Sequence, residues 1–218
     1  MNIESVIDHC LLDPCATITE IDKLCIEAKE HHFRAVCVLP MFVKRAKEML
    51  KGTPVKTATI AGFPFGHTAI EAKLAETVLA IVDGADEIEL VINRSALKNA
   101  DWQYLAREIN SIMPVIRGKG RGVKMILETE IMDEKEIITC CDIYGAAGVD
   151  GIITSSGYPK GVTSIEKIKL LRKHLADAVK LIAGGVPGDY AMAKQCIEAG
   201  ADGIGSENSL EIVKSALV

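Results

Sequence analysis

The sequence lacks the features that mark membrane-spanning, secreted and nucleic-acid-binding proteins. No apolar run approaches the roughly 20 residues that a transmembrane helix needs, and the N-terminus has neither the basic nor the apolar region of a signal peptide. Lysines and arginines form no long block, and the net charge is -5, which disfavours binding to a phosphate backbone. We therefore expect a cytoplasmic protein that binds neither nucleic acid nor membranes.

The cysteines also lack a recognisable pattern. There are seven of them, an odd number, and no two are spaced as Cys-x-x-Cys. A disulfide framework or a zinc knuckle would need paired or clustered cysteines. We expect most of them to be small apolar core residues in a reducing compartment.

Nothing in the sequence indicates a second domain, because linkers and low-complexity segments are absent. The chain has 218 residues, of which 49% are hydrophobic and 25% are charged. This composition is typical of a globular protein, and the length suffices for one large core. We predict one domain that covers residues 1–218.

A short phrase with the pattern Gly-x-Asp-x-Ile recurs three times, at Gly84, Gly148 and Gly200. Each copy follows an amphipathic stretch and precedes a short apolar run. This pattern predicts a helix that ends on a glycine, a tight turn and then a buried strand. The spacing fits two strand–helix units of roughly 25–30 residues between copies, so the copies should introduce alternate strands.

Eight short apolar segments are candidate strands, and helical stretches alternate with them. Thr68 with Glu71 and Thr163 with Glu166 are candidate capping boxes at two helix starts. In the first of these helices, we predict an apolar face formed by Ile70, Leu74, Val78 and Ile81 or Val82. The predicted strands are residues 6–11, 35–39, 56–61, 87–92, 123–127, 151–154, 180–183 and 203–205. Eight such units favour a closed (β/α)8 TIM barrel, an α/β fold, over an open sheet.

Several sequence blocks resemble the 2-deoxyribose-5-phosphate aldolase family, in the same order as in that family. They are Asp-His-Cys-Leu-Leu at 8–12, Ala-Val-Cys-Val-Leu-Pro at 35–40, Gly-Phe-Pro-x-Gly at 62–66, and the segments 86–93, 124–129 and 150–157. The resemblance covers nearly the whole chain. It implies a class I aldolase barrel, hence a carbon–carbon lyase of carbohydrate metabolism that acts on a small sugar phosphate or aldehyde without a cofactor.

The two lysines of the family mechanism are replaced in this chain. The resemblance places the Schiff-base lysine at Ile153, and a second lysine, which lowers the pKa of the first, at Leu181. Neither isoleucine nor leucine can attack a carbonyl. The sequence therefore predicts little or no ordinary Schiff-base aldolase activity.

Four candidate catalytic residues remain at positions that the resemblance places in the pocket: Asp8, Cys37, Glu89 and Lys124. Glu89 stands where the family has an aspartate, so the carboxylate is one methylene longer. Strand alternation puts Lys124 and Glu128 on one face of their strand. They are either a structural ion pair, or Lys124 has taken over as nucleophile or as acid and base.

The candidate ligand and phosphate site contains small and hydroxyl residues at the ends of three strands. They are Thr154, Ser155, Ser156, Gly157, Gly184, Gly185, Gly205 and Ser206. Backbone amides in such loops often hold phosphate in barrels. Glu207 either points inward, where it would repel phosphate, or faces solvent at a helix start.

We predict no metal site, because His67, Glu89 and Glu128 lack the close histidine spacing of metal centres. Three functions stay open. The chain is an aldolase that uses Lys124, a lyase or isomerase that uses Glu89, Asp8 and Lys124 for acid–base chemistry, or a sugar-phosphate-binding pseudoenzyme. A homodimer is our expectation for its assembly.

Overall fold

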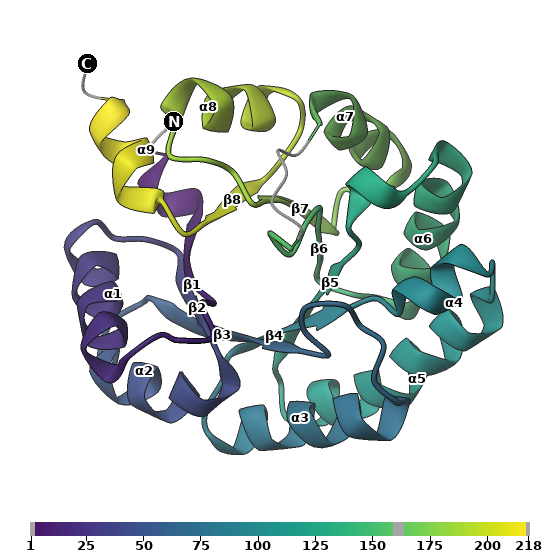
Figure 1. The fold of residues 1–218 in the computed structure, drawn as a ribbon, viewed down its shortest axis with the longest axis horizontal. Helices are drawn as coiled ribbons and strands as arrows, with labels where there is room; N and C mark the ends of the chain where they lie inside the picture. The colour runs from purple at the N-terminus through teal and green to yellow at the C-terminus, as the bar shows by residue number, and fades with distance from the viewer. Residues whose placement is uncertain (1–2, 159–163, 217–218) are drawn as a thin grey trace.

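The computed structural model describes residues 3–158 and 164–216, and its eight strands close into a parallel barrel in sequence order (Figure 1). The strands are β1 Ile7–Leu11, β2 Ala35–Val38, β3 Lys56–Ala61, β4 Glu87–Val91, β5 Gly122–Ile126, β6 Gly151–Ile153, β7 Lys180–Gly184 and β8 Gly203–Ser206. β8 pairs with β1, which closes the ring. The predicted (β/α)8 barrel is confirmed, and each predicted strand end differs from the observed one by at most one residue.

Helices surround the barrel and cover its outer face (Figure 1). They are α1 Ile18–Glu30, α2 Val43–Met49, α3 Ile70–Val82, α4 Arg94–Lys98, α5 Trp102–Gly118, α6 Glu134–Ala147, α7 Ile165–His174, α8 Tyr190–Glu198 and α9 Ser209–Ser215. There are also three 3-10 turns among the described residues: Glu4–Val6 before β1, Pro40–Phe42 between β2 and α2, and Thr129–Ile131 between β5 and α6. Among the described residues, no helix combines the length and the apolar character that crossing a membrane requires.

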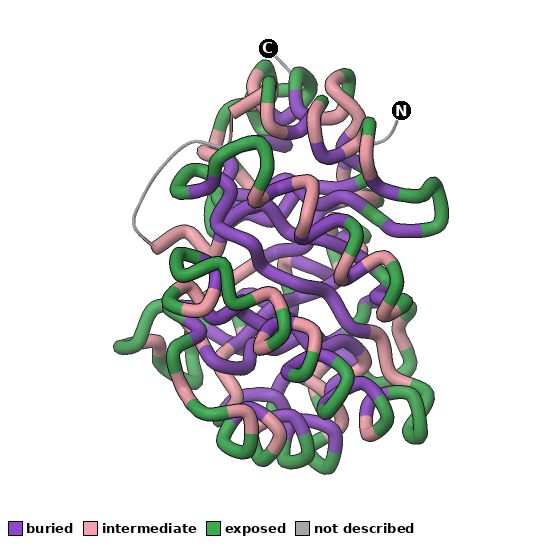
Figure 2. Tube along the Cα trace, turned by 90° about the vertical axis from the view of Figure 1, so that its right-hand side faces the viewer, coloured by how far each residue is buried: buried purple, intermediate pink, exposed green. Residues whose placement is uncertain are grey.

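The buried residues form two groups, one outside and one inside the ring of strands. The larger group fills the space between strands and helices, and Figure 2 shows it as a buried band enclosed by exposed segments. The inner group consists of Leu12, Cys37, Ala58, Ile60, Val91, Ile126, Ile153 and Ile182. Since strand side chains alternate between the two faces, each of the strands β2 to β7 contributes to both groups.

The three repeated phrases introduce β4, β6 and β8, as their spacing predicts. Each phrase contains an aspartate that accepts a backbone N–H from the preceding strand. The bonds are Thr57 to Asp86 at 3.0 Å, Val123 to Asp150 at 2.7 Å, and Leu181 to Asp202 at 2.9 Å. The repeat therefore fixes the N-terminal ends of neighbouring strands relative to each other.

Replacing one of these aspartates should lower stability measurably. Asp150→Ala removes the acceptor of the buried Val123 N–H and the ion pair with Arg117 at 2.9 Å. We expect a loss of about 1–3 kcal/mol in the free energy of unfolding, measured by urea unfolding followed by circular dichroism. Asp142→Ala, an exposed position on α6, is the control and should change it by less than about 0.5 kcal/mol. Equal effects of the two changes would contradict the assigned role.

Two predicted helix starts differ from the observed ones. α3 begins at Ile70 after Ala69, which provides no side-chain cap, so the capping box at Thr68 is wrong. α7 begins after Ser164, whose hydroxyl accepts the Lys167 N–H at 3.4 Å. Thr163, predicted for that role, lies outside the described residues.

The buried face of α3 agrees only in part with the predicted apolar one, since Ile81 is buried and Leu74 packs against the core but Val78 is exposed. The buried residues are Lys73, Thr77, Ala80 and Ile81, whereas Val82 is 76% exposed. The Lys73 ammonium donates to the Val91 carbonyl and to the Glu108 carboxylate, both at 2.7 Å. These contacts link α3 to β4 and α5, and they place a charged residue on the buried face of the helix, which hydrophobicity alone does not predict.

Candidate active site

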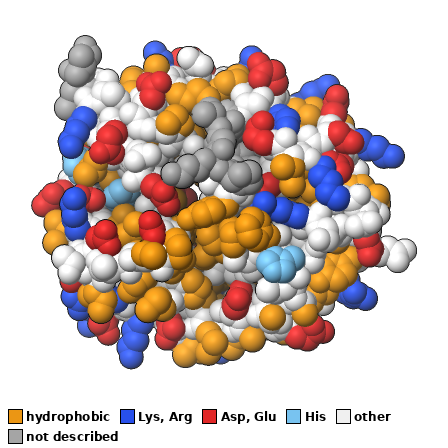
Figure 3. Space-filling model, viewed as in Figure 1, with side chains coloured by type: hydrophobic (Ala, Val, Ile, Leu, Met, Phe, Trp, Pro, Cys, Tyr) orange, Lys and Arg blue, Asp and Glu red, His pale blue; other side chains and the backbone are white. Residues whose placement is uncertain are grey.

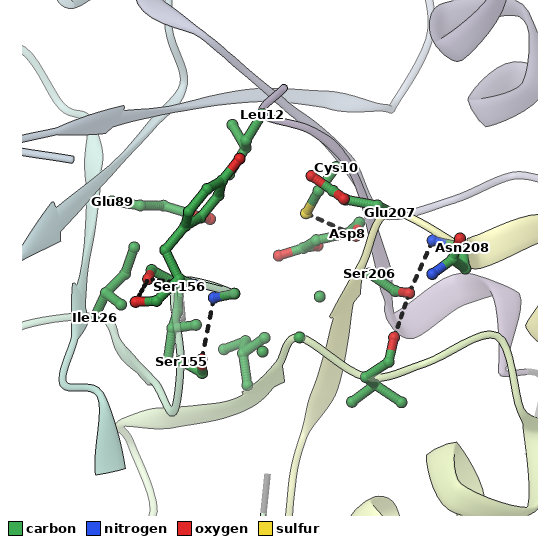
Figure 4. Close-up of a pocket in the computed structure, with 18 of the residues that line it drawn as sticks. Asp8, Cys10, Leu12, Glu89, Ile126, Ser155, Ser156, Ser206, Glu207 and Asn208 are labelled. Carbon is green, nitrogen blue, oxygen red and sulfur yellow. Dashed lines mark hydrogen bonds between the residues drawn. The ribbon is translucent and has the colours of Figure 1, made fainter. Parts of the chain in front are cut away.

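A pocket of about 450 Å³ opens at the C-terminal ends of the strands. Its lining residues come from β1 and β4 to β8 and from the loops that follow β1, β6, β7 and β8. Figure 4 shows Asp8, Cys10 and Glu89 pointing into this space from their strands, with Ser155 and Ser206 at its border. On the molecular surface, apolar side chains gather near the centre of the face seen in Figure 3. The size suits a small-molecule ligand.

One wall of the pocket is apolar and is built from three isoleucines on adjacent strands. Ile126, Ile153 and Ile182 lie side by side in register on β5, β6 and β7, and each is at most 5% exposed. Ile153 therefore lies in the pocket, as its position in the sequence motif predicts. Among the described lining residues, none carries an amine or a guanidinium group.

Leu181 does not belong to this wall, contrary to its predicted place beside Ile153. It is the register partner of Ile152 and packs in the outer core under the helices. Ile182 is the residue of β7 that faces the pocket. The difference arises because counting back from the two glycines does not fix which face of β7 a residue occupies.

Lys124 lies at the base of the pocket in a buried cluster of charges. Its ammonium is 2.7 Å from Glu87, 2.9 Å from Asp8 and 3.2 Å from Glu89. Arg34 forms a second bridge, since its guanidinium donates to both carboxylate oxygens of Asp8 and to Glu87 at 2.8 and 3.0 Å. Two cations and three carboxylates thus close the barrel interior below the isoleucines.

The cluster keeps Lys124 protonated. Burial alone would lower the pKa of Lys124, but Asp8 and Glu89 raise it well above its ordinary value. Burial would raise the pKa of Asp8, yet Lys124 and Arg34 hold it below its usual range, and the same two cations lower the pKa of Glu87. An ammonium held in this way is not a nucleophile, so the geometry argues against an imine on Lys124.

Glu89 differs from its two acidic neighbours. Burial, together with the charge of Asp8, raises the pKa of Glu89 in spite of the attraction of Lys124. The thiol of Cys37 donates to its second carboxylate oxygen at 3.4 Å. Asp8 and Glu89 both line the pocket, whereas Lys124 and Cys37 lie behind them. The four predicted catalytic residues are therefore brought together, with only two of them at the pocket surface.

The predicted pair of Lys124 with Glu128 is wrong. β5 ends at Ile126, and the backbone of Glu128 is left-handed with a φ of 59°, so strand alternation does not extend to it. The Glu128 carboxylate instead accepts the Ser156 N–H and lies 3.4 Å from the Arg94 guanidinium. Arg94 also donates to the carbonyls of Pro64 and Tyr158 at 2.9 and 2.7 Å. This network holds the loop after β6 against the loop after β3.

The predicted ligand-binding residues meet at the rim of the pocket, with one exception. Ser155, Ser156, Gly157, Gly184, Gly185, Gly205 and Ser206 all line it. Thr154 is fully buried behind the rim, where its hydroxyl accepts the Gly184 N–H at 3.0 Å. The Ser206 hydroxyl donates to the Val186 carbonyl at 2.6 Å and accepts the Asn208 N–H at 3.0 Å. Part of the polar rim thus serves to fix the loops.

Glu207 is an exposed residue of the pocket rim, and Figure 4 shows its side chain near Cys10 at the mouth. It lies ahead of α9, whose N-cap is Asn208. Among the described residues, no group of three His, Cys, Asp or Glu side chains is placed to hold a metal ion. His67 lies exposed on the loop before α3.

Sequence reasoning missed Arg34, Glu87 and Arg94. Of the three, Glu87 was the easiest to predict from the sequence. It is two residues from Glu89 on the same strand and therefore points to the same face. Arg34 precedes β2, and Arg94 begins α4, so no strand alternation applies to either. Their roles depend on contacts between segments that are far apart in the chain.

Comparison with known proteins decides the family. A model of the DeoC/LacD family aldolases matches residues 5–207. The chain belongs to this aldolase family. It is 43% identical to a deoxyribose-phosphate aldolase of Caldanaerobacter subterraneus subsp. tengcongensis over 215 residues, which cover 98% of this chain and 93% of the relative. It is 42% identical to a deoxyribose-phosphate aldolase of Thermococcus gammatolerans over 218 residues, with 99% and 97% covered.

Solved structures agree with this assignment. An aldolase named QR15 superposes with a TM-score of 0.92 at 32% identity, covering all of this chain and 96% of that one. A deoxyribose phosphate aldolase from Aeropyrum pernix, described as a tetramer, superposes with a TM-score of 0.92 at 27% identity, covering 99% and 92%. The family resemblance and the barrel inferred from the sequence are both confirmed.

Proposed function

We propose that this member of the aldolase family is a carbon–carbon lyase for a small sugar phosphate or aldehyde, and that it transfers protons through Glu89 without forming an imine. One observation carries the proposal: Glu89 is a buried carboxyl group that lines the pocket and whose pKa is raised. Such a carboxyl group takes up and releases protons closer to neutral pH than an ordinary glutamate does.

The reaction needs a single protein group that accepts a proton and later returns it. Cleavage of a β-hydroxy aldehyde begins when a base removes the hydroxyl proton. The carbon–carbon bond then breaks, one aldehyde leaves, and the electron pair stays on the other fragment as an enolate. Returning the same proton to carbon completes the second aldehyde. Glu89 is placed to take and return the proton, while the Lys124 ammonium stabilises its carboxylate form at 3.2 Å.

The substrate class rests on the pocket and on the relatives. The volume of about 450 Å³ fits a small sugar derivative, and the rim offers hydroxyl and backbone groups from Ser155, Ser156 and Gly185. The relatives named above are deoxyribose-phosphate aldolases. 2-Deoxyribose 5-phosphate is therefore the first compound to test.

The test combines trapping with turnover. The protein is incubated with 2-deoxyribose 5-phosphate, acetaldehyde release is followed with a coupled dehydrogenase, and a parallel sample is treated with borohydride and analysed by mass spectrometry. We expect turnover without a lysine adduct. Glu89→Gln should lower kcat by about 10²–10⁴-fold, whereas Glu71→Gln, exposed on α3, should leave it unchanged.

Two outcomes would contradict the proposal in different ways. An adduct on any lysine of the native chain would show that an imine forms after all. Stabilisation by the ligand without turnover, and without exchange of the acetaldehyde methyl protons in deuterium oxide by NMR, would identify a sugar-phosphate-binding protein instead.

A further inference from the structure

Two of the cysteines lie side by side inside the barrel. Cys10 on β1 and Cys37 on β2 are register partners in the parallel sheet. Strand alternation puts both on the interior face, where Cys37 belongs to the inner core and Cys10 packs against it. The proposed lyase reaction assigns no role to this pair of sulfur atoms.

The spacing of neighbouring strands brings the two sulfur atoms within reach of each other. Adjacent strands lie about 4.7–4.9 Å apart, which falls within the Cα separation of about 4.4–6.8 Å that disulfides span. The Cys10 thiol donates to the carbonyl of Asp8 at 3.3 Å. A bond between them therefore needs no rearrangement of the barrel beyond a small approach of two strands.

The surroundings of the two thiols differ, and the difference assigns them separate roles. Cys10 lines the pocket and is partly exposed, so a small oxidant reaches it (Figure 4). Cys37 is fully buried, and the neighbouring Cys10, its burial and the charge of Glu89 hold its pKa well above the ordinary value. Its thiol already donates to the Glu89 carboxylate at 3.4 Å, which provides an acceptor for its proton.

We propose that Cys10 and Cys37 are an oxidation site for hydrogen peroxide or small alkyl peroxides, at which Cys10 reacts first and Cys37 then closes a disulfide. The Cys10 thiolate attacks one peroxide oxygen, the O–O bond breaks, and the departing hydroxide or alkoxide takes up a proton and leaves as water or an alcohol. Cys37 transfers its proton to Glu89 and attacks the sulfur of the Cys10 sulfenic acid, whose hydroxyl takes that proton from Glu89 and leaves as water. Two thiols are oxidised and one peroxide is reduced.

The disulfide has a direct consequence for the pocket. It removes the thiol proton that Cys37 donates to Glu89 and ties β1 to β2 beside that carboxylate. The other cysteines lack a partner in such a position among the described residues: Cys15 is exposed, and Cys25 and Cys196 are buried away from the pocket. Cys140 and Cys141 are adjacent in α6, also away from the pocket.

The test reads the sulfur chemistry and does not depend on the proposed lyase activity. Cys10 and Cys15 share a tryptic peptide, residues 1–23, which has no internal lysine or arginine. The experiment therefore uses a Cys15→Ser background. The protein is treated with hydrogen peroxide, free thiols are alkylated, and the digest is analysed by mass spectrometry. We expect peptides 1–23 and 35–44 to become linked in most molecules, and dithiothreitol to release them.

Single variants separate the two roles, and the melting temperature of each variant verifies that it folds. Cys10→Ser should abolish the link, and Cys37→Ser should leave a persistent sulfenic acid on Cys10 that dimedone traps. Dimedone labelling of Cys10 in the chain with Cys37 intact should be brief. Cys10 that stays reduced while the four buried cysteines of the helices are oxidised, or that keeps its sulfenic acid with Cys37 present, would overturn the proposal.

Discussion

Replacing Ile153 by lysine should give this pocket the ability to form an imine with a small aldehyde. The side chain at this position is 5% exposed and lies between Ile126 and Ile182. Burial among apolar groups disfavours the ammonium form and lowers the pKa of a lysine from its ordinary value of about 10.4. The amine should then attack a carbonyl near neutral pH.

Borohydride trapping measures this gain. Ile153→Lys is incubated with acetaldehyde and borohydride, and peptide mapping should locate a reduced adduct at position 153 in most molecules, whereas the unaltered chain gives none there. Adding Ile182→Lys places a second cation on the neighbouring strand. This change should lower the pKa of the amine at position 153 further and speed trapping at neutral pH.

Leu181→Lys is the matched control, because it introduces the same group one residue away on the other face of β7. Its ammonium would enter the outer core, where Leu181 is fully buried, and should destabilise the protein by several kcal/mol, on the order of an unpaired buried charge. It should give no adduct in the pocket. Trapping at position 181 with none at position 153 would show that the assigned strand faces are reversed.

This contrast marks the limit of what the sequence predicts. The strands were predictable because each is a short apolar run between two helical stretches. The repeated turns with glycine and aspartate also showed the spacing of alternate strands. The face of a strand was not predictable where its register was counted back from the glycines at its end. A shift of one residue on β7 exchanges Leu181 for Ile182, and therefore exchanges outer core for pocket.

The charged residues show a second limit. Asp8, Glu89 and Lys124 were found through the family motifs, but their partner Arg34 lies between two elements and carries no pattern of its own. Lys73 was not among the residues predicted to face the core, and charged side chains are seldom fully buried. It is instead buried with Glu108 at 2.7 Å, a pairing that depends on how α3 packs against α5.

Replacing Lys124, the buried cation at the base of the pocket, should strongly lower the stability of the protein. Lys124→Met keeps the length of the side chain but leaves three carboxylates, Asp8, Glu87 and Glu89, without their shared ammonium. Arg34 still pairs with Asp8 and Glu87, whereas Glu89 loses its only cationic partner among the described residues. We expect a loss of about 3–5 kcal/mol in the free energy of unfolding at neutral pH.

The loss should depend on pH. Without Lys124 the pKa of Glu89 rises further, since burial is no longer opposed, and a carboxyl group whose folded pKa exceeds the unfolded one costs stability as the pH rises above the unfolded value. In the native chain, the lowered pKa values of Asp8 and Glu87 give stability that is present above about pH 4 and is lost as the pH falls further. Both effects make the difference in the free energy of unfolding between the native chain and Lys124→Met smaller at acidic pH.

Urea unfolding at pH 5 and pH 8 measures this difference. Lys119→Met, an exposed lysine at the end of α5, should change the free energy of unfolding by less than about 0.5 kcal/mol at either pH. Lys124→Met combined with Glu89→Gln should recover part of the loss at pH 8, because the group left without a cation is then neutral. A loss that is the same at both pH values, and that Glu89→Gln does not relieve, would mean that Lys124 stabilises the barrel by packing. The proposed stabilisation of the Glu89 carboxylate by its ammonium would then have no support.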